Sequence, residues 1–114
     1  MRAENRTRGV TLATDVAVAD RFGTRLLGLM GKPPLAAGAA LLIRPCDGIH
    51  TCFMRAAIDA VFLDAAGQVV AAVGPLAPWR LTRVYPRAEA VLELPPGTIA
   101  ASGTAEGDVV ELVA

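Results

Sequence analysis

The chain of 114 residues carries 11 basic and 11 acidic side chains, and 54% of its residues are hydrophobic. This length suits one domain with a single core, and the cancelling charges exclude a broad positive field that would attract nucleic acid or an anionic membrane. No apolar run reaches the roughly 18 residues of a membrane-spanning helix. We expect a polar tail over residues 1–8 and one globular domain over residues 9–114, without nucleic-acid or membrane partners. The first residues also lack the pattern of a secretory signal, which predicts a cytoplasmic protein with reduced thiols.

Runs of β-branched and apolar residues predict strands along most of the chain. The expected strands are Val10–Ala19 (two short strands or one bent strand), Ala39–Ile43, Ile58–Leu63, Gln68–Val73, Ala90–Leu94 and Val109–Val113, with Gly74–Pro78 as a loop. Asp64-Ala65-Ala66-Gly67 is typical of a hairpin turn, because Asp favours the first turn position and Gly tolerates a left-handed backbone. Because the connections are short, we expect antiparallel pairing in a mainly β fold, as a sandwich or partly closed barrel.

One or two short helices complete the predicted fold. Asp20 can cap a helix whose apolar positions recur every four residues as far as Met30, and a glycine and a proline follow to end it. Pro95-Pro96-Gly97 opens a short helical turn toward Ser102. Phosphate-loop and dinucleotide-binding motifs are absent, so the sequence predicts no cofactor.

The segment 44–55 contains the only histidine and both cysteines. Cys46, His50 and Cys52 have the same parity, so a regular strand would place all three on one face, where they could bind zinc. The spacing lacks a paired C-x-x-C clip, however, and a proline and a glycine interrupt the pattern. His50 and Cys52 could also serve as base and nucleophile, although side chains two residues apart on a strand start about 6–7 Å apart at the backbone. We assign no metal ligand and keep a metal- or thiol-dependent enzyme as an alternative.

Two carboxylates lie in strands whose other residues are typical of an interior. Asp59 follows Ile58, and Glu93 lies between two leucines. An uncompensated buried charge costs about 3–5 kcal/mol, so Asp59 needs Arg55, Arg80 or backbone amides as partners. Two interpretations remain open: either Glu93 faces solvent and Asp59 pairs with Arg55 structurally, or both carboxylates line a cleft together with arginine.

Aromatic and basic residues alternate from Trp79 to Arg87. Such a composition is typical of platforms on which single-stranded nucleic acid stacks. The neutral total charge argues against that function, and we prefer to interpret the segment as a sheet edge with solvated arginines.

Several motifs stand in a characteristic order along the chain: Arg25–Lys32, Ile49-His50-Thr51 with Met54-Arg55, Ile58–Asp64 with Gly67, and Ala90–Leu94 with Gly97 and Gly107-Asp108. In order and spacing they resemble the family called domain of unknown function 192, over nearly all of the chain from Val10 onward. The resemblance implies a compact, mainly β domain without an established activity, found in bacteria and archaea and often behind export signals.

His50, Arg55, Asp59 and Glu93 match the pattern of this family, whereas Cys52 stands where the family usually has a different residue. A proline is also common in the family at the position before Ile58, where this chain has alanine. A mechanism that used Cys52 would therefore not be shared by the family.

Together these residues predict a non-catalytic domain that binds a small polar or carboxylate-bearing ligand, such as a sugar, in a shallow cleft. His50, Arg55, Asp59 and Trp79 would form the cleft, with Glu93 as a further ligand-binding residue. Arginine offers a bidentate fork and tryptophan a stacking face. A protein-interaction module that binds a partner or a second copy through an open sheet edge is a further alternative.

Overall fold

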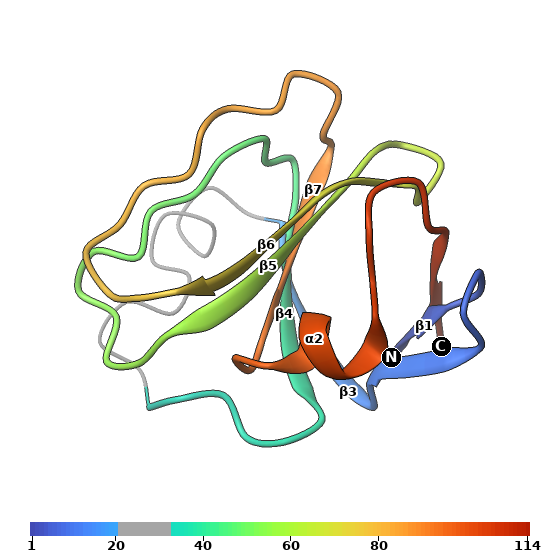
Figure 1. Cartoon of the computed structure of the whole chain (residues 1–114), viewed down its shortest axis with the longest axis horizontal. Coiled ribbons are helices and arrows are strands. Elements are labelled where there is room, and N and C mark those ends of the chain that lie inside the picture. Colours follow the sequence, from blue (N-terminus) through green and yellow to red (C-terminus); the bar gives the residue numbers. More distant parts are fainter. Residues whose placement is uncertain (21–32) are drawn as a thin grey trace.

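The computed structural model describes residues 1–20 and 33–114, which form two packed β-sheets (Figure 1). One sheet has three strands in the order β2-β1-β8, and the other has five in the order β3-β4-β7-β5-β6. The elements are β1 (Arg2–Asn5), β2 (Val10–Ala13), β3 (Asp15–Ala19), β4 (Ala39–Ile43), β5 (Ile58–Leu63), β6 (Val69–Leu76), β7 (Ala90–Leu94), the short helix α2 (Thr98–Ser102) and β8 (Val110–Val113). The described chain is thus a mainly β, sandwich-like fold, as predicted, and its sheets do not close into a barrel.

Most of the predicted elements are confirmed. The run 10–19 forms two strands, and β4, β5 and β7 have the predicted bounds. At the hairpin between β5 and β6, Asp64 Oδ1 accepts hydrogen bonds from the N–H groups of Ala66 and Gln68, each at 2.9 Å, and Gly67 has a φ of 84°. The helix predicted after Asp20 lies outside the described residues. No helix in the described ranges is long and apolar enough to cross a membrane.

Three expectations are wrong. Residues 2–5 are not a tail but strand β1, in which Ala3 and Asn5 point inward and are fully buried, while the side chain of Arg2 is exposed. Strands β3 and β4 pair in parallel rather than antiparallel. The expected loop from Gly74 begins later, because β6 extends to Leu76 and pairs there with Ile58.

The five-stranded sheet has two buried faces. Its inner face carries Leu42, Val61 and Leu92, which pack with Leu12 and Val110 of the three-stranded sheet. Its outer face carries Leu41, Phe62 and Val91 among other buried residues, and the loops 44–57 and 77–89 lie over it on the left of Figure 1. Burial of both faces explains why every residue of β5 is buried.

Candidate functional site

The two loops that cover the outer face are joined to each other by backbone hydrogen bonds. His50 and Leu81 form an isolated antiparallel bridge, and the N–H of Thr82 donates to the carbonyl of Ile49 at 2.9 Å. Further along, the N–H of Tyr85 donates to the carbonyl of Asp47 at 2.8 Å. The loops therefore behave as one irregular ribbon, anchored to the sheet below by partly buried apolar residues such as Ile49.

Thr51 is the centre of this ribbon. It is fully buried, and its hydroxyl donates to the carbonyl of Ala77 at 2.6 Å while accepting the N–H of Arg80 at 2.8 Å. Its carbonyl accepts the N–H of Trp79 at 3.0 Å and that of Met54 at 3.2 Å. One buried side chain and its backbone thus fix the positions of two loop tips that are more than twenty residues apart in sequence.

These two tips display an aromatic pair, Phe53 and Trp79, at the surface. Their ring centroids are 4.7 Å apart, and 59% and 58% of their respective surfaces are exposed. Both residues have a left-handed backbone, with φ of 63° for Phe53 and 65° for Trp79. Bulky residues rarely adopt this conformation, which costs about 1–3 kcal/mol each and occurs most often at functional sites. Holding these two large apolar rings in solvent therefore lowers the stability of the fold.

The exposed polar residues predicted for the site lie on the same ribbon. His50 and Arg55 are both exposed, and they lie three residues before and two after Phe53. Nδ1 of His50 accepts the N–H of Cys52 at 3.2 Å, so this nitrogen is not available to take a proton from the Cys52 thiol. Among the described residues, no three His, Cys, Asp or Glu side chains gather closely enough to hold a metal ion. The described residues therefore contain no three-residue metal cluster, and Nδ1 of His50 does not act as a base toward Cys52.

Asp59 does not belong to this surface. It lies on the inner face opposite Leu94, is 1% exposed, and its Oδ2 accepts the backbone N–H of Ile99 in the first turn of α2 at 2.8 Å. Gly97, which precedes the helix, supplies no side-chain cap, so Asp59 performs that role from another element. A Cβ on Gly74 would lie 2.9 Å from the Cα of Asp59, which shows how closely β6 approaches it. The structural pairing of Asp59 with Arg55 is wrong, and the expectation of backbone amides as partners is confirmed.

Glu93 lies on the outer face, opposite to the face of Asp59. It is 1% exposed, and its cross-strand neighbours are Leu41 and Ala60, so the expectation that it faces solvent is wrong. Burial raises its pKa to about 7, because water no longer solvates the charged form. Its Oε1 has no hydrogen-bond partner in the described ranges. The two carboxylates therefore do not line one cleft, since the sheet itself separates them.

The sequence argument identified Trp79, His50 and Arg55 but missed Phe53 and Thr51. Phe53 directly follows the segment that contains the histidine and both cysteines. Pro45 and Gly48 make this segment an irregular loop, and an aromatic residue in such a loop has no strand face to pack on, which was the available sign that Phe53 is exposed. The role of Thr51 depends on contacts with residues 77–80, which no local pattern encodes.

The architecture defines a class of small β domains in which a five-stranded sheet is covered on one face by a second sheet and on the other by loops. The chain belongs to the family DUF192, described as "Uncharacterized ACR", which matches residues 3–112. It is 36% identical over 110 residues to the UPF0127 protein PF1050 of Pyrococcus furiosus, covering 94% of each chain, and 37% identical over 98 residues to the UPF0127 protein PH1112 of Pyrococcus horikoshii, covering 82% and 83%.

Two solved structures share the fold. The crystal structure of a protein of unknown function from Novosphingobium aromaticivorans superposes with a TM-score of 0.77 at 18% identity, covering 98% of this chain and 93% of that chain. A crystal structure from Sinorhizobium meliloti gives a TM-score of 0.79 at 22% identity, covering 96% and 89%. The three chains thus share one fold although their sequences differ at most positions.

Proposed function

We propose that this domain binds a small polar ligand with a flat apolar face, such as a sugar ring, on the aromatic pair Phe53 and Trp79, without chemical conversion of the ligand. The observation that carries the proposal is the exposure of both rings on a left-handed backbone fixed by Thr51. A ring that is already held in place loses little conformational entropy on binding, which is the benefit of preorganisation.

Polar groups beside the pair suit the edges of such a ligand. His50 and Arg55 flank Phe53 in sequence, and Arg80 follows Trp79; all three are exposed. A guanidinium offers several N–H donors in one plane, and an imidazole offers one donor and one acceptor, so hydroxyl or carboxylate groups of the ligand find partners. Asp59 and Glu93 are buried within the five-stranded sheet and do not contact the ligand in this proposal.

The single tryptophan of the chain makes the proposal directly measurable. Because Trp79 is the only indole and is itself the proposed stacking face, its fluorescence reports on this surface alone. Titration with methyl β-glucoside, methyl β-galactoside and benzoate should change its emission for at least one of these probes, saturably and with a Kd of about 1 mM or lower.

A matched variant distinguishes stacking from a general solvent effect. Phe53→Ala should abolish the change in Trp79 emission, whereas Leu81→Ala, at a residue that is 78% exposed on the same ribbon, should leave it intact. Emission that stays constant with every probe, or that changes equally in the Phe53 variant, would contradict the proposal.

Two other predictions concern partners and location. Binding of a protein or a second copy through the outer edge of β6, which is the last strand of its sheet, is tested by sedimentation at several concentrations. A cytoplasmic location stays a prediction that fractionation of the host cell tests.

A further inference from the structure

A separate hollow of about 650 Å³ lies along the edge strand β6, away from the aromatic pair. Three segments far apart in sequence form it: Val70–Val73 of β6, the loop 83–87, and the region around the end of α2, which contributes Ile99, Thr104, Ala105 and Glu106. Its size falls within the range of about 300–1,000 Å³ that is usual for small-molecule sites.

The base of this hollow is apolar and rigid. Val70 is buried, and Ala71, Val73 and Ile99 are partly buried and pack against the two cores. Tyr85 lies with its ring 4.6 Å from that of Phe62, which is fully buried on the outer face. The aromatic wall of the hollow is therefore anchored directly to the core of the five-stranded sheet.

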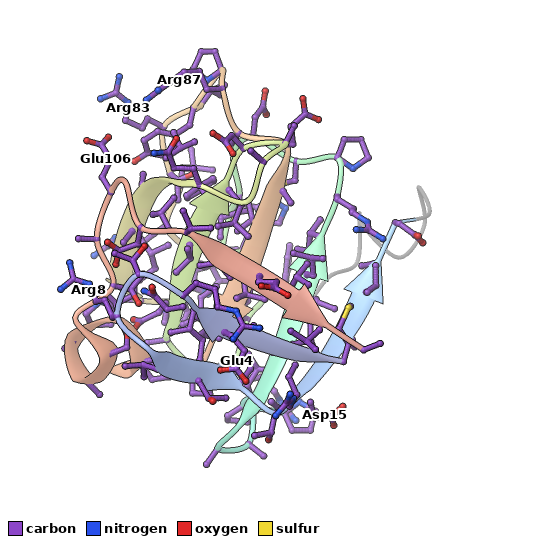
Figure 2. The ribbon with its side chains drawn as sticks, turned by 90° about the vertical axis from the view of Figure 1, so that its right-hand side faces the viewer. Glu4, Arg8, Asp15, Arg83, Arg87 and Glu106 are labelled. Atoms are coloured by element: carbon purple, nitrogen blue, oxygen red, sulfur yellow. The ribbon has the colours of Figure 1, made fainter. Side chains whose placement is uncertain are left out.

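Two arginines stand at the rim. The guanidinium carbon of Arg83 lies 5.5 Å from the centroid of the Tyr85 ring, a cation–π contact that restricts its motion. Arg87 lies at the tip of a turn closed by a hydrogen bond of 2.8 Å from the N–H of Ala88 to the carbonyl of Tyr85. Figure 2 shows both arginines at one end of the molecule, with Glu106 near them.

The charged groups at this rim form no ion pair within the described chain. The ion pairs among residues 1–20 and 33–114 are Arg2 with Glu4, Arg6 with Glu111 and Arg8 with Asp108, so neither Arg83 nor Arg87 pairs with a carboxylate there. Glu106 lines the same hollow without pairing to either arginine. Two guanidinium groups and one carboxylate leave a local excess of one positive charge.

We infer that this hollow binds a small organic anion with a single carboxylate and an apolar body. The carboxylate would receive N–H donors from Arg83 and Arg87, which present planar forks suited to that group, while the apolar part would cover Val70–Val73 and the ring of Tyr85. Glu106 partly offsets the positive charge of the two arginines and so weakens the binding of an anion at this rim. This site is independent of the aromatic pair, and either can fail alone.

The experiment compares two probes of one shape, 3-phenylpropionate and its neutral amide 3-phenylpropionamide, each added to the 15N-labelled chain and followed by backbone amide chemical shifts. We expect 3-phenylpropionate to shift the amides of Val70–Val73 and Tyr85 saturably. The neutral probe 3-phenylpropionamide should bind at least about tenfold more weakly than 3-phenylpropionate, because it loses the charge-assisted hydrogen bonds to the arginines.

Substitutions at the rim then assign the charges. Arg83→Gln and Arg87→Gln should each weaken binding of 3-phenylpropionate about tenfold, whereas Arg44→Gln, at an exposed arginine outside both the hollow and the aromatic surface, is the matched control and should change nothing. Glu106→Gln should tighten the binding of 3-phenylpropionate, because it removes a negative charge from the rim.

Three results would overturn the inference: equal binding of the neutral amide, unchanged affinity in both arginine variants, or shifts confined to residues outside the hollow. Thermal unfolding of each variant confirms that the fold is retained, which is expected because all three substituted rim residues are exposed.

Discussion

Asp59 and Ile99 are forty residues apart in sequence, yet the carboxylate of the first caps the helix that contains the second through a hydrogen bond of 2.8 Å. The donor is one of the N–H groups that the first turn of a helix leaves without an internal partner. Asp59 thereby links strand β5 to α2 and to the chain segment that leads into β8.

Substitution of Asp59 should therefore affect stability. We expect Asp59→Ala to lower the free energy of unfolding by about 2–3 kcal/mol, because a buried hydrogen bond to a charged acceptor is lost. Asp59→Asn keeps an acceptor oxygen and should cost less. Urea unfolding of both variants measures the difference, with Asp47→Ala at an exposed aspartate as the control. A loss for Asp59→Ala no larger than that for Asp47→Ala would refute the capping role.

The raised pKa of Glu93 predicts a pH dependence of stability. Its ordinary pKa of 4.5 applies to the unfolded chain, whereas burial raises the pKa to about 7 in the folded state. The folded state therefore binds the proton more tightly, and this contribution is complete below pH 4.5 and is lost as the pH rises through about 7.

Glu93→Gln removes this titration and keeps the shape of the side chain. We expect the variant and the unsubstituted chain to have similar stability near pH 4.5, and the variant to be more stable by about 3 kcal/mol above pH 7. Chemical unfolding at several pH values between 4 and 8 measures the difference. A constant difference across this range would show that Glu93 does not titrate there.

Asp108 should make stability depend on pH in the opposite direction, and at lower pH than Glu93 does. Hydrogen bonds from the side chains of Arg8 and Asn5 lower its pKa to about 2, so its contribution to stability is present above the ordinary value of 3.8 and is lost as the pH falls toward 2. In the variant Asp108→Asn, the loss of stability between pH 3.8 and about 2 that comes from this carboxyl group should disappear. Direct titration of the Asp108 carboxyl carbon by NMR provides the check, and a midpoint near 3.8 would contradict the expected effect.

The left-handed backbone at Phe53 predicts an unusual order of two small substitutions. Phe53→Ala and Phe53→Gly both remove the contact with Trp79, but only glycine adopts the φ of 63° without steric cost. We expect Phe53→Gly to be more stable than Phe53→Ala by about 1 kcal/mol, whereas glycine is normally the less stable of the two. Thermal unfolding of the pair measures this order, and the reverse order would indicate that the backbone is not strained.

Local patterns in the sequence were sufficient for most strands. β4, β5 and β7 consist almost wholly of apolar residues, and the Asp64–Gly67 turn encodes its own geometry, so their bounds follow from propensity. β1 could not be found in this way, because Arg2 and Glu4 dominate a four-residue strand whose partners lie at residues 10–13 and 110–113. The parallel pairing of β3 with β4 likewise depends on the path of the chain between them, which periodicity does not determine.

The candidate site was predictable only in part. Composition drew attention to His50, Arg55 and Trp79, since polar and aromatic residues in a mostly apolar chain are informative. It could not reveal that Asp59 and Glu93 lie on opposite faces of the sheet. Asp59 pairs with Leu94 and Glu93 pairs with Ala60, so the two carboxylates are one position apart in the register of β5 and β7 and point to opposite faces. Nor could it reveal the hollow on β6, whose arginines come from a segment best explained, from sequence alone, as a solvated edge.

The pairing of β1 with β8 has a consequence for synthesis. Arg2 pairs with Val113 and Ala3 with Leu112, so the three-stranded sheet joins almost the first residues of the chain to almost the last. A ribosome makes β1 about a hundred residues before β8, and the loop between the two strands must close over that length. Until β8 emerges, Leu42, Val61 and Leu92 lack their cover on the inner face. The nascent chain therefore passes through a period in which an apolar sheet is exposed, when binding by a chaperone would protect it from aggregation.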